Sequence, residues 1–257
     1  MRLDITLFEK GLAKSRTAAK EMISSGGVYV DGKEITKASF AVDDNAQIEV
    51  KCAVSRFVGR GGYKLLGAIE CFNIDVSGFV CADLGASTGG FCDCLLQHGA
   101  KKVYAIDVGE NQLDQKLRND NRVVNIEKTN IRIIEENTLP EKTDFVTADL
   151  SFISITFAVE PIKKILKPDG CGVLLIKPQF EAGKQGVGKN GLVKDKKIHE
   201  KVLEKVTLAF ANGGFSILGL EPSPIRGGDG NTEYLLYIKN SGTEFNADIK
   251  NTVQKAF

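Results

Sequence analysis

The chain has 257 residues, of which 42% are hydrophobic and 26% are charged, and its formal net charge is +1. This composition excludes an intrinsically disordered chain, and the length favours one larger domain with one small module. The near-neutral balance excludes a molecule that is basic overall, so any nucleic-acid-binding surface must be local.

The N-terminal segment carries Asp4 and Glu9 where a signal peptide would need an apolar stretch, and no long apolar run occurs in the chain. We therefore expect a cytoplasmic protein that does not bind membranes. The six cysteines and two histidines show no metal-ligand spacing, so we expect free thiols and no metal site. The sequence leaves the oligomeric state open.

Residues 5–24 predict two short helices that are separated at Gly11, with Ser15 as the cap of the second. The pair Asp31-Gly32 then lies between two short β-type runs and predicts a hairpin, because these residues readily adopt positive φ angles. A further strand is expected at residues 48–50. These elements predict a small α+β domain over residues 1–52.

The order of these motifs, from Arg2-Leu-Asp through Gly27-Val-Tyr-Val-Asp-Gly32, resembles the S4-type RNA-binding domain. The resemblance implies that the helical face binds the RNA phosphate backbone, which positions RNA without reading its sequence. Charge alone leaves a solvated face as an alternative, because residues 1–60 hold ten Lys and Arg against eight Asp and Glu. The candidate RNA contacts on this face are Lys10, Lys14, Arg16 and Lys20.

Residues 53–62 predict an inter-domain linker, since glycine and basic residues occur there without helical or strand periodicity. The apolar side chains of Phe57 and Val58 suggest that this linker docks on a domain surface. Arg56 and Arg60 are further candidate RNA contacts.

Seven apolar runs alternate with helix-like stretches from Phe79 onward, and they begin near residues 79, 101, 122, 143, 171, 215 and 232. This alternation predicts an α/β fold with a mostly parallel sheet that helices cover on both faces. We assign this Rossmann-like domain to residues 63–241 and a C-terminal tail to residues 242–257. Ligands in such sheets bind beyond the carboxyl ends of the strands.

The first run ends in a glycine-rich turn, Asp83-Leu-Gly-Ala-Ser-Thr-Gly-Gly-Phe91, which lacks the G-x-G-x-x-G spacing of dinucleotide sites. The second run ends in Asp107, where a carboxylate can accept hydrogen bonds from ribose hydroxyls. After the third run, Asn130 either contacts an adenine edge or forms an Asx-turn. Together these features resemble the S-adenosylmethionine site of class I methyltransferases, with the candidate contacts Asp83, Gly85, Ser87, Gly89, Gly90, Phe91, Asp107, Asn130 and Asp149.

Four charged residues, Lys64, Asp149, Lys177 and Glu233, follow the linker or flank later runs. Each alone is compatible with a solvated strand end, but their order resembles the catalytic tetrad of FtsJ-like 2′-O-ribose methyltransferases. A ribose hydroxyl needs a base to remove its proton, and a lysine serves only when burial and a nearby cation lower its pKa from about 10.4. We predict Lys177 as this base and Lys64 as the nearby cation.

Asp149 is expected near the transferred methyl group, and Glu233 is expected to orient a lysine or the 2′-hydroxyl. From about residue 2 to residue 239, the chain resembles the TlyA, or hemolysin A, family of ribosomal RNA methyltransferases, on RFVGRGGYKL, DLGASTGGF, ADLSF, IKPQFE and GNTEY. The resemblance implies 2′-O-methylation of cytidine, with ribosomal RNA or ribosomal subunits as partners. The target nucleotide and the subunit stay open.

Four alternatives compete with this interpretation. An RNA base N-methyltransferase would use Asp149-Leu-Ser-Phe152 as an acid-Pro-Pro-aromatic motif, but both prolines are absent and the two lysines would have no role. A cytosine-C5 enzyme would need a Pro-Cys pair, which does not occur. A non-catalytic ribosome-binding factor would not need the tetrad, and a hemolysin-like protein would need a spanning or strongly amphipathic segment.

Overall fold

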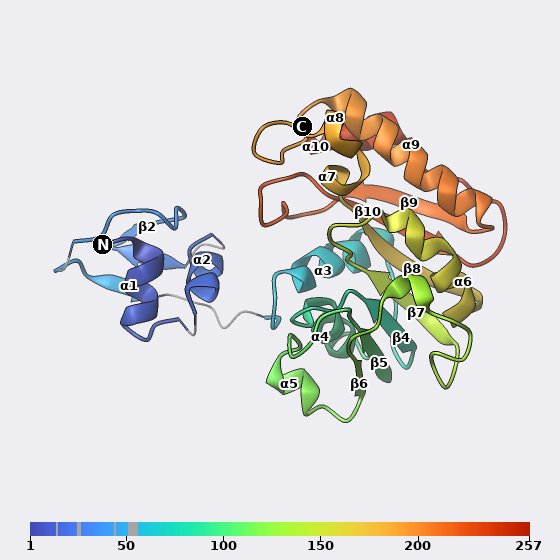
Figure 1. Ribbon diagram of the computed structural model, residues 1–257, viewed down its shortest axis with the longest axis horizontal. Coiled ribbons are helices and arrows are strands. Elements are labelled where there is room, and N and C mark those ends of the chain that lie inside the picture. The colour runs from blue at the N-terminus through green and yellow to red at the C-terminus, as the bar shows by residue number, and fades with distance from the viewer. Residues whose placement is uncertain (14, 25–26, 44, 51–55) are drawn as a thin grey trace. The chain divides into compact units, whose positions relative to one another are not determined.

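Separate hydrophobic cores divide the chain into two units, Met1–Arg56 and Phe57–Phe257. The computed structural model describes residues 1–13, 15–24, 27–43, 45–50 and 56–257. Figure 1 labels the elements of both units.

The first unit has the predicted pair of helices and three short antiparallel strands. Its sheet has the order β2-β1-β3, and Asp31 and Gly32 take positive φ angles in the turn between β1 and β2. Leu3, Leu7 and Ile23 are completely buried in its core. The elements are α1 (Leu3–Glu9), α2 (Arg16–Ser24), β1 (Val28–Val30), β2 (Lys33–Glu34) and β3 (Ile48–Val50).

The second unit is built on a seven-stranded sheet with the order β6-β5-β4-β7-β8-β10-β9. Strands β4 to β8 are parallel, and β10 runs antiparallel to both of its neighbours. The predicted mostly parallel, Rossmann-like sheet is therefore confirmed. The strands are β4 (Val80–Leu84), β5 (Lys102–Ile106), β6 (Val123–Ile126), β7 (Thr143–Ala148), β8 (Leu166–Ile176), β9 (Ser216–Pro222) and β10 (Tyr234–Lys239).

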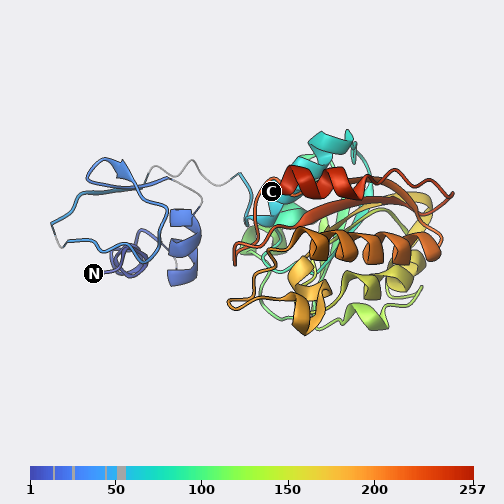
Figure 2. The ribbon, with the colours of Figure 1, turned by 90° about the horizontal axis from the view of Figure 1, so that it is seen from above.

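Helices lie on both faces of this sheet (Figure 2). One face packs against α3 (Gly61–Phe72), α4 (Gly90–Gln97) and α5 (Gln115–Arg118), and the other packs against α6 (Val159–Ile165) and α9 (Lys196–Asn212). Two 3₁₀ turns, η1 (Ile131–Ile133) and η2 (Ile155–Ala158), join the second layer. The remaining helices are α7 (Pro178–Glu181), α8 (Gly183–Gly186) and α10 (Ile249–Ala256).

The two faces of the sheet are apolar because successive strand residues point in opposite directions. In β4, Ala82 and Leu84 belong to the core beneath α6 and α9, whereas Cys81 belongs to the core beneath α3 and α4. The same alternation holds in β8, where Leu174 and Val173 are buried on opposite faces. This alternation decides which helices the residues at each strand end will face.

Two segments that we expected outside the catalytic domain are packed within the second unit. Phe57, from the expected linker, is only 2% exposed, and a Cβ atom at Gly62 would lie 2.5 Å from the Cβ of Phe57. Residues 53–55 of that linker lie outside the described residues. The expected C-terminal tail contains α10, whose Val253 is 1% exposed in the main core.

Candidate active site

Three of the four predicted catalytic residues lie at one edge of the sheet because of the way the strands run. Asp149 directly follows β7, Lys177 directly follows β8, and Glu233 directly precedes the antiparallel strand β10. Tyr234 pairs with Ile176 in the antiparallel ladder, so Glu233 and Lys177 lie opposite each other just beyond this pair. The carboxyl ends of β7 and β8 and the amino end of β10 therefore meet.

The same three side chains also face one side of the sheet. Their strand neighbours Ala148, Ile176 and Tyr234 are buried beneath α6 and α9. Side chains alternate along a strand, so the next residue in each case faces α3. Lys64 lies in the first turn of α3, and Leu65 of the same helix is completely buried against the sheet.

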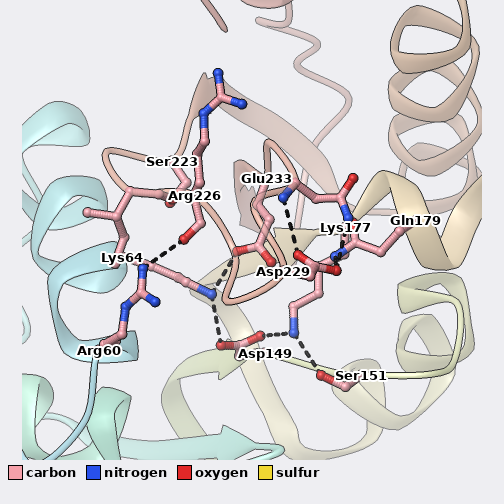
Figure 3. A network of polar contacts seen from close by, with 12 residues as sticks. Arg60, Lys64, Asp149, Ser151, Lys177, Gln179, Ser223, Arg226, Asp229 and Glu233 are labelled. Atoms are coloured by element: carbon pink, nitrogen blue, oxygen red, sulfur yellow. Dashed lines mark hydrogen bonds and ion pairs between the residues drawn. The ribbon is translucent and has the colours of Figure 1, made fainter. Parts of the chain in front are cut away.

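The four side chains form one ionic cluster, which Figure 3 shows. The Nζ atom of Lys64 lies 2.7 Å from Glu233 Oε2 and 3.6 Å from Asp149 Oδ2. The Nζ atom of Lys177 lies 2.7 Å from Asp149 Oδ1. The carboxylate of Asp149 thus lies between two ammonium groups, and the fold brings all four predicted residues together.

Ser151 also contacts this cluster, although no sequence pattern points to it. Lys177 Nζ donates a hydrogen bond of 2.9 Å to Ser151 Oγ, as Figure 3 also shows. Ser151 follows Asp149 by two residues, so one short segment after β7 supplies both oxygen atoms. A serine in a strand-end loop carries no signal of this role until the position of Lys177 is known.

Burial sets the electrostatics of the cluster. Lys64 and Lys177 are each 8% exposed, and Glu233 is 3% exposed. Burial raises the pKa of Glu233, although the charge of Lys64 opposes this shift. A Cβ atom at Gly227 would lie 2.6 Å from Glu233 Oε1, so the loop between β9 and β10 covers this carboxyl with bare backbone. Charges that water screens so little interact strongly.

A cavity of about 420 Å³ adjoins the cluster, and Asp149 and Ser151 form part of its wall. Its size suits a small-molecule cofactor. The predicted cofactor contacts that line it are Gly85, Ser87, Asp107, Asn130 and Asp149.

The turn after β4 can pass close to the end of β7 because of Gly85. Gly85 has a φ of +80°, and a Cβ atom there would lie 2.7 Å from the carbonyl oxygen of Asp149. The absent side chain therefore permits both the backbone conformation and the close approach of the two strand ends. This is the tight backbone cradle that a nucleoside cofactor site needs.

Asp107 ties the turn after β4 to the end of β5. Its Oδ2 accepts a hydrogen bond of 2.8 Å from the amide of Ser87, and its Oδ1 accepts one of 2.7 Å from the amide of Gly109. Carboxylate oxygens can accept more than one hydrogen bond, so Asp107 can still bind ribose hydroxyls. Asn130 Oδ1 accepts from the amide of Arg132 and caps η1, and the same residue lines the cavity. The two roles expected for Asn130 are therefore compatible.

Asp83, another predicted cofactor contact, does not line the cavity and is 1% exposed. Its carboxylate accepts hydrogen bonds from Thr147 Oγ1 at 2.8 Å and from Cys92 Sγ at 3.1 Å. Burial raises the pKa of Asp83 to about 6, against the opposing effect of these two hydrogen bonds. Asp83 therefore links the end of β4 to β7 and to α4 through hydrogen bonds inside the domain.

Gly89, Gly90 and Phe91 also do not line the cavity. A Cβ atom at Gly89 would lie 2.2 Å from Leu117 Cδ1, and one at Gly90 would lie 2.9 Å from the amide nitrogen of Gly62. Phe91 is 3% exposed in the core beneath α3 and α4. These three residues pack the start of α4 against its neighbours, a role that their place in a glycine-rich turn does not distinguish from cofactor contact.

Several residues of the cavity wall were not predicted from the sequence. Six of the nine lie within two residues of a predicted strand-end residue, so proximity along the chain was the available signal. Phe152 is the most unusual, with a positive φ of 66° and 87% exposure. The unpredicted wall residues are Val108, Gln112, Thr129, Ile131, Arg132, Leu150, Ser151, Phe152 and Ile153.

The predicted RNA contacts of the first unit lie on its surface where they can be described. Lys10 and Lys20 are exposed, and Lys14 lies outside the described residues. Arg16 is exposed too, but its Nη2 lies 3.4 Å from Oδ2 of the buried Asp4. This contact fixes the guanidinium and offsets part of its charge.

The two arginines expected near the linker differ in their surroundings. Arg56 is exposed, whereas Arg60 is partly buried and donates from Nη2 to the carbonyl oxygen of Arg226 at 3.2 Å. Figure 3 places Arg60 and Arg226 beside the catalytic cluster. Arg60 therefore lies close to the candidate active site.

Within the described ranges, no helix is long and apolar enough to cross a bilayer. The same residues contain no group of three or more His, Cys, Asp or Glu side chains that could hold a metal ion. The cysteines that are described have free thiols.

Comparison with known proteins gives two family matches. Residues 57–240 match the FtsJ-like methyltransferases, and residues 1–48 match the S4 domain. The chain is 41% identical to the 16S/23S rRNA (cytidine-2′-O)-methyltransferase TlyA of Mycobacterium tuberculosis, over 93% of this chain and 89% of that protein. It is 44% identical to Hemolysin A of Brachyspira hyodysenteriae, over 93% of this chain and 99% of that protein.

A solved structure from Streptococcus thermophilus, which bears a provisional hemolysin name, resembles the whole chain. Its TM-score is 0.80 at 42% identity, with 100% of this chain and 95% of that chain covered. The two family matches, these relatives and the ionic cluster at the sheet edge agree with one another. The chain therefore belongs to the TlyA family of ribosomal RNA methyltransferases, which joins an S4 domain to an FtsJ-like methyltransferase domain.

Proposed function

We propose that this protein transfers a methyl group from S-adenosylmethionine to the ribose 2′-oxygen of a cytidine in ribosomal RNA. The observation that carries the proposal is an ionic cluster that adjoins a cofactor-sized cavity through Asp149. The cluster consists of Lys64, Asp149, Lys177 and Glu233. The printed names of the TlyA relatives support cytidine and ribosomal RNA as the substrate.

S-adenosylmethionine supplies an electrophilic methyl group on a sulfonium. Asp107 and Asn130 would hold its ribose and adenine, and the bare backbone at Gly85 would lie against its methionine part. Asp149 reaches both this cavity and the lysines, so it would place the methyl group next to the base. Such placement can supply a large part of the rate acceleration of an in-line transfer.

Lys177 would accept the proton of the ribose 2′-hydroxyl. The bound cofactor would supply the methyl group and leave as a neutral thioether, and Lys177 Nζ would hold the hydroxyl proton until water removes it. Lys64 brings a second positive charge to the other oxygen of Asp149, and Glu233 orients Lys64 at 2.7 Å. This arrangement gives each predicted catalytic residue a function in ribose chemistry.

The N-terminal unit would deliver the RNA, with Lys10, Arg16 and Lys20 as phosphate contacts. This division of labour assigns residues 1–52 to RNA binding and residues 63–241 to catalysis. The substrate would be ribosomal RNA or a ribosomal subunit, so we place the protein in the cytoplasm.

The chemical test uses the alkali resistance of a 2′-O-methylated nucleotide. Purified protein, ribosomal subunits that lack the modification and cofactor with a labelled methyl group are incubated, and the RNA is then hydrolysed in alkali. Because the methyl blocks the attacking 2′-oxygen, the label should remain in a dinucleotide that contains cytidine. Label released in a mononucleotide would place the methyl on a base and contradict the proposal. Protein with Lys177→Arg serves as the control for the methylation signal.

A further inference from the structure

Two acceptors contact the Lys177 amine in the part of the chain that the structure describes. Asp149 Oδ1 lies 2.7 Å from Nζ, and Ser151 Oγ accepts a hydrogen bond of 2.9 Å from it. Figure 3 shows both contacts of Lys177 Nζ, one to Asp149 and one to Ser151, which belong to the same segment after β7. The ionic cluster explains the first contact but not the second.

The geometry of an amine gives the second contact a purpose. A neutral amine carries two N–H bonds and one lone pair in a roughly tetrahedral arrangement, and the lone pair accepts the substrate proton. With a single acceptor, the amine could rotate about its Cε–Nζ bond between positions that aim the lone pair differently. The hydrogen bond to Ser151 Oγ holds one N–H bond, and the close ionic contact with Asp149 Oδ1 restrains the amine from a second side, so fewer directions remain for the lone pair.

The two strand-end segments that carry these groups are also tied together at a second point. Glu181, in the helix directly after Lys177, is 7% exposed. Its Oε2 accepts a hydrogen bond of 2.7 Å from Ser154 Oγ, and its Oε1 accepts one of 2.6 Å from the amide of Ile155. These hydrogen bonds hold the segment of Ser151 against the segment of Lys177, which favours the contact between the two side chains.

We propose that Ser151 is a positioning residue that, with Asp149, aims the lone pair of Lys177 at the ribose hydroxyl. This inference rests on the proposed function, in which Lys177 takes the 2′-hydroxyl proton. Asp149 cannot fix the amine alone, because its carboxylate is shared with Lys64. The Ser151 hydroxyl stays bonded to Lys177 throughout, and it neither gains nor loses a proton.

The experiment compares Ser151→Ala and Ser151→Thr with the wild type in single-turnover methylation at saturating cofactor across a range of pH. Ser151→Ala should lower the rate plateau at high pH by roughly ten- to a hundredfold, because misaimed reactants lose rate even when the base is neutral. Ser151→Thr retains the hydroxyl, and its extra methyl has room because Ser151 is exposed. It should recover most of the plateau. Cofactor affinity, measured by calorimetry, should stay within about threefold of the wild type in both variants, which also shows that they fold.

Ser241→Ala is the control, since it removes a hydroxyl that donates to Asp169 and lies outside the cavity wall. It should leave the plateau unchanged at saturating cofactor. Three outcomes would overturn the role of Ser151. In the first, Ser151→Ala has the same maximal rate as the wild type. In the second, Ser151→Ala is slower at neutral pH but reaches the wild-type rate when the pH is raised, and in the third a loss of cofactor affinity accounts for the slower rate. Failure of the proposed function is separate, because the wild type itself would then yield no alkali-resistant nucleotide.

Discussion

Replacement of Asp83 by asparagine tests whether ionisation of this buried carboxyl destabilises the folded protein. Burial raises its pKa from 3.8 to about 6, so the folded state binds this proton more tightly than the unfolded chain. The stabilisation from proton binding is complete below about pH 4 and is lost as the pH rises through about 6. A shift of about two pKa units corresponds to about 3 kcal/mol over the whole range.

Asparagine is neutral at every pH, so Asp83→Asn should become more stable relative to the wild type as the pH rises. Between about pH 4.5 and 7.5, we expect the difference in free energy of unfolding to change by about 2 kcal/mol in favour of the variant. The hydrogen bonds from Thr147 and Cys92 add an offset of about 1 kcal/mol that depends little on pH. The chain has no tryptophan, so urea unfolding is followed by far-ultraviolet circular dichroism.

Asp75→Asn provides the control for this experiment. A hydrogen bond from Ser77 lowers the pKa of Asp75, so its contribution is present above its unfolded pKa and is lost only as the pH falls further. Its difference from the wild type should be flat above about pH 5. A flat difference for Asp83→Asn over the same range would show that Asp83 ionises without cost and would refute the reasoning.

Three further predictions concern catalysis and binding. Lys177→Arg keeps the positive charge but lacks an amine that can lose its proton, so turnover should fall at least about a hundredfold while calorimetric cofactor affinity stays near normal; appreciable turnover would remove Lys177 as the base. Asp107→Ala should weaken cofactor binding by roughly tenfold or more without unfolding the domain, and unchanged affinity would place Asp107 outside the site. A protein that begins at Val54 should bind cofactor but lose most activity on folded ribosomal RNA, and full activity would make the N-terminal unit dispensable.

The ionic cluster could be predicted from the sequence because its members are tied to strand ends. Apolar runs predict strands, and parallel strands bring their carboxyl ends to one edge, so Asp149 and Lys177 were expected to be near each other. The antiparallel direction of β10, which brings the residue before it to the same edge, has no signature in the run TEYLLYIK. Only the resemblance to a known tetrad placed Glu233 in the site.

The cofactor turn could be located but not resolved residue by residue. A glycine-rich stretch indicates that its backbone lies close to another part of the protein or to a ligand. At Gly85, the backbone lies at the cavity and next to the end of β7. At Gly89, it lies next to the side chain of Leu117, from a helix more than twenty residues away. The sequence pattern is the same in both cases, because the cause lies in tertiary packing.

Asp149 connects every part of the proposed reaction, and this limits what its replacement can show. Its two carboxylate oxygens contact Lys177 and Lys64, and its side chain forms part of the cavity wall. Its backbone carbonyl lies close to Gly85. A change at Asp149 therefore alters the aim of the base, the charge between the lysines and the cofactor site at once. Ser151 contacts Lys177 but not Lys64 among the described interactions. Of the two described oxygen contacts of Lys177, Ser151 is thus the one whose replacement leaves the ion pairs of the cluster in place, so it separates the aim of the base from its charge.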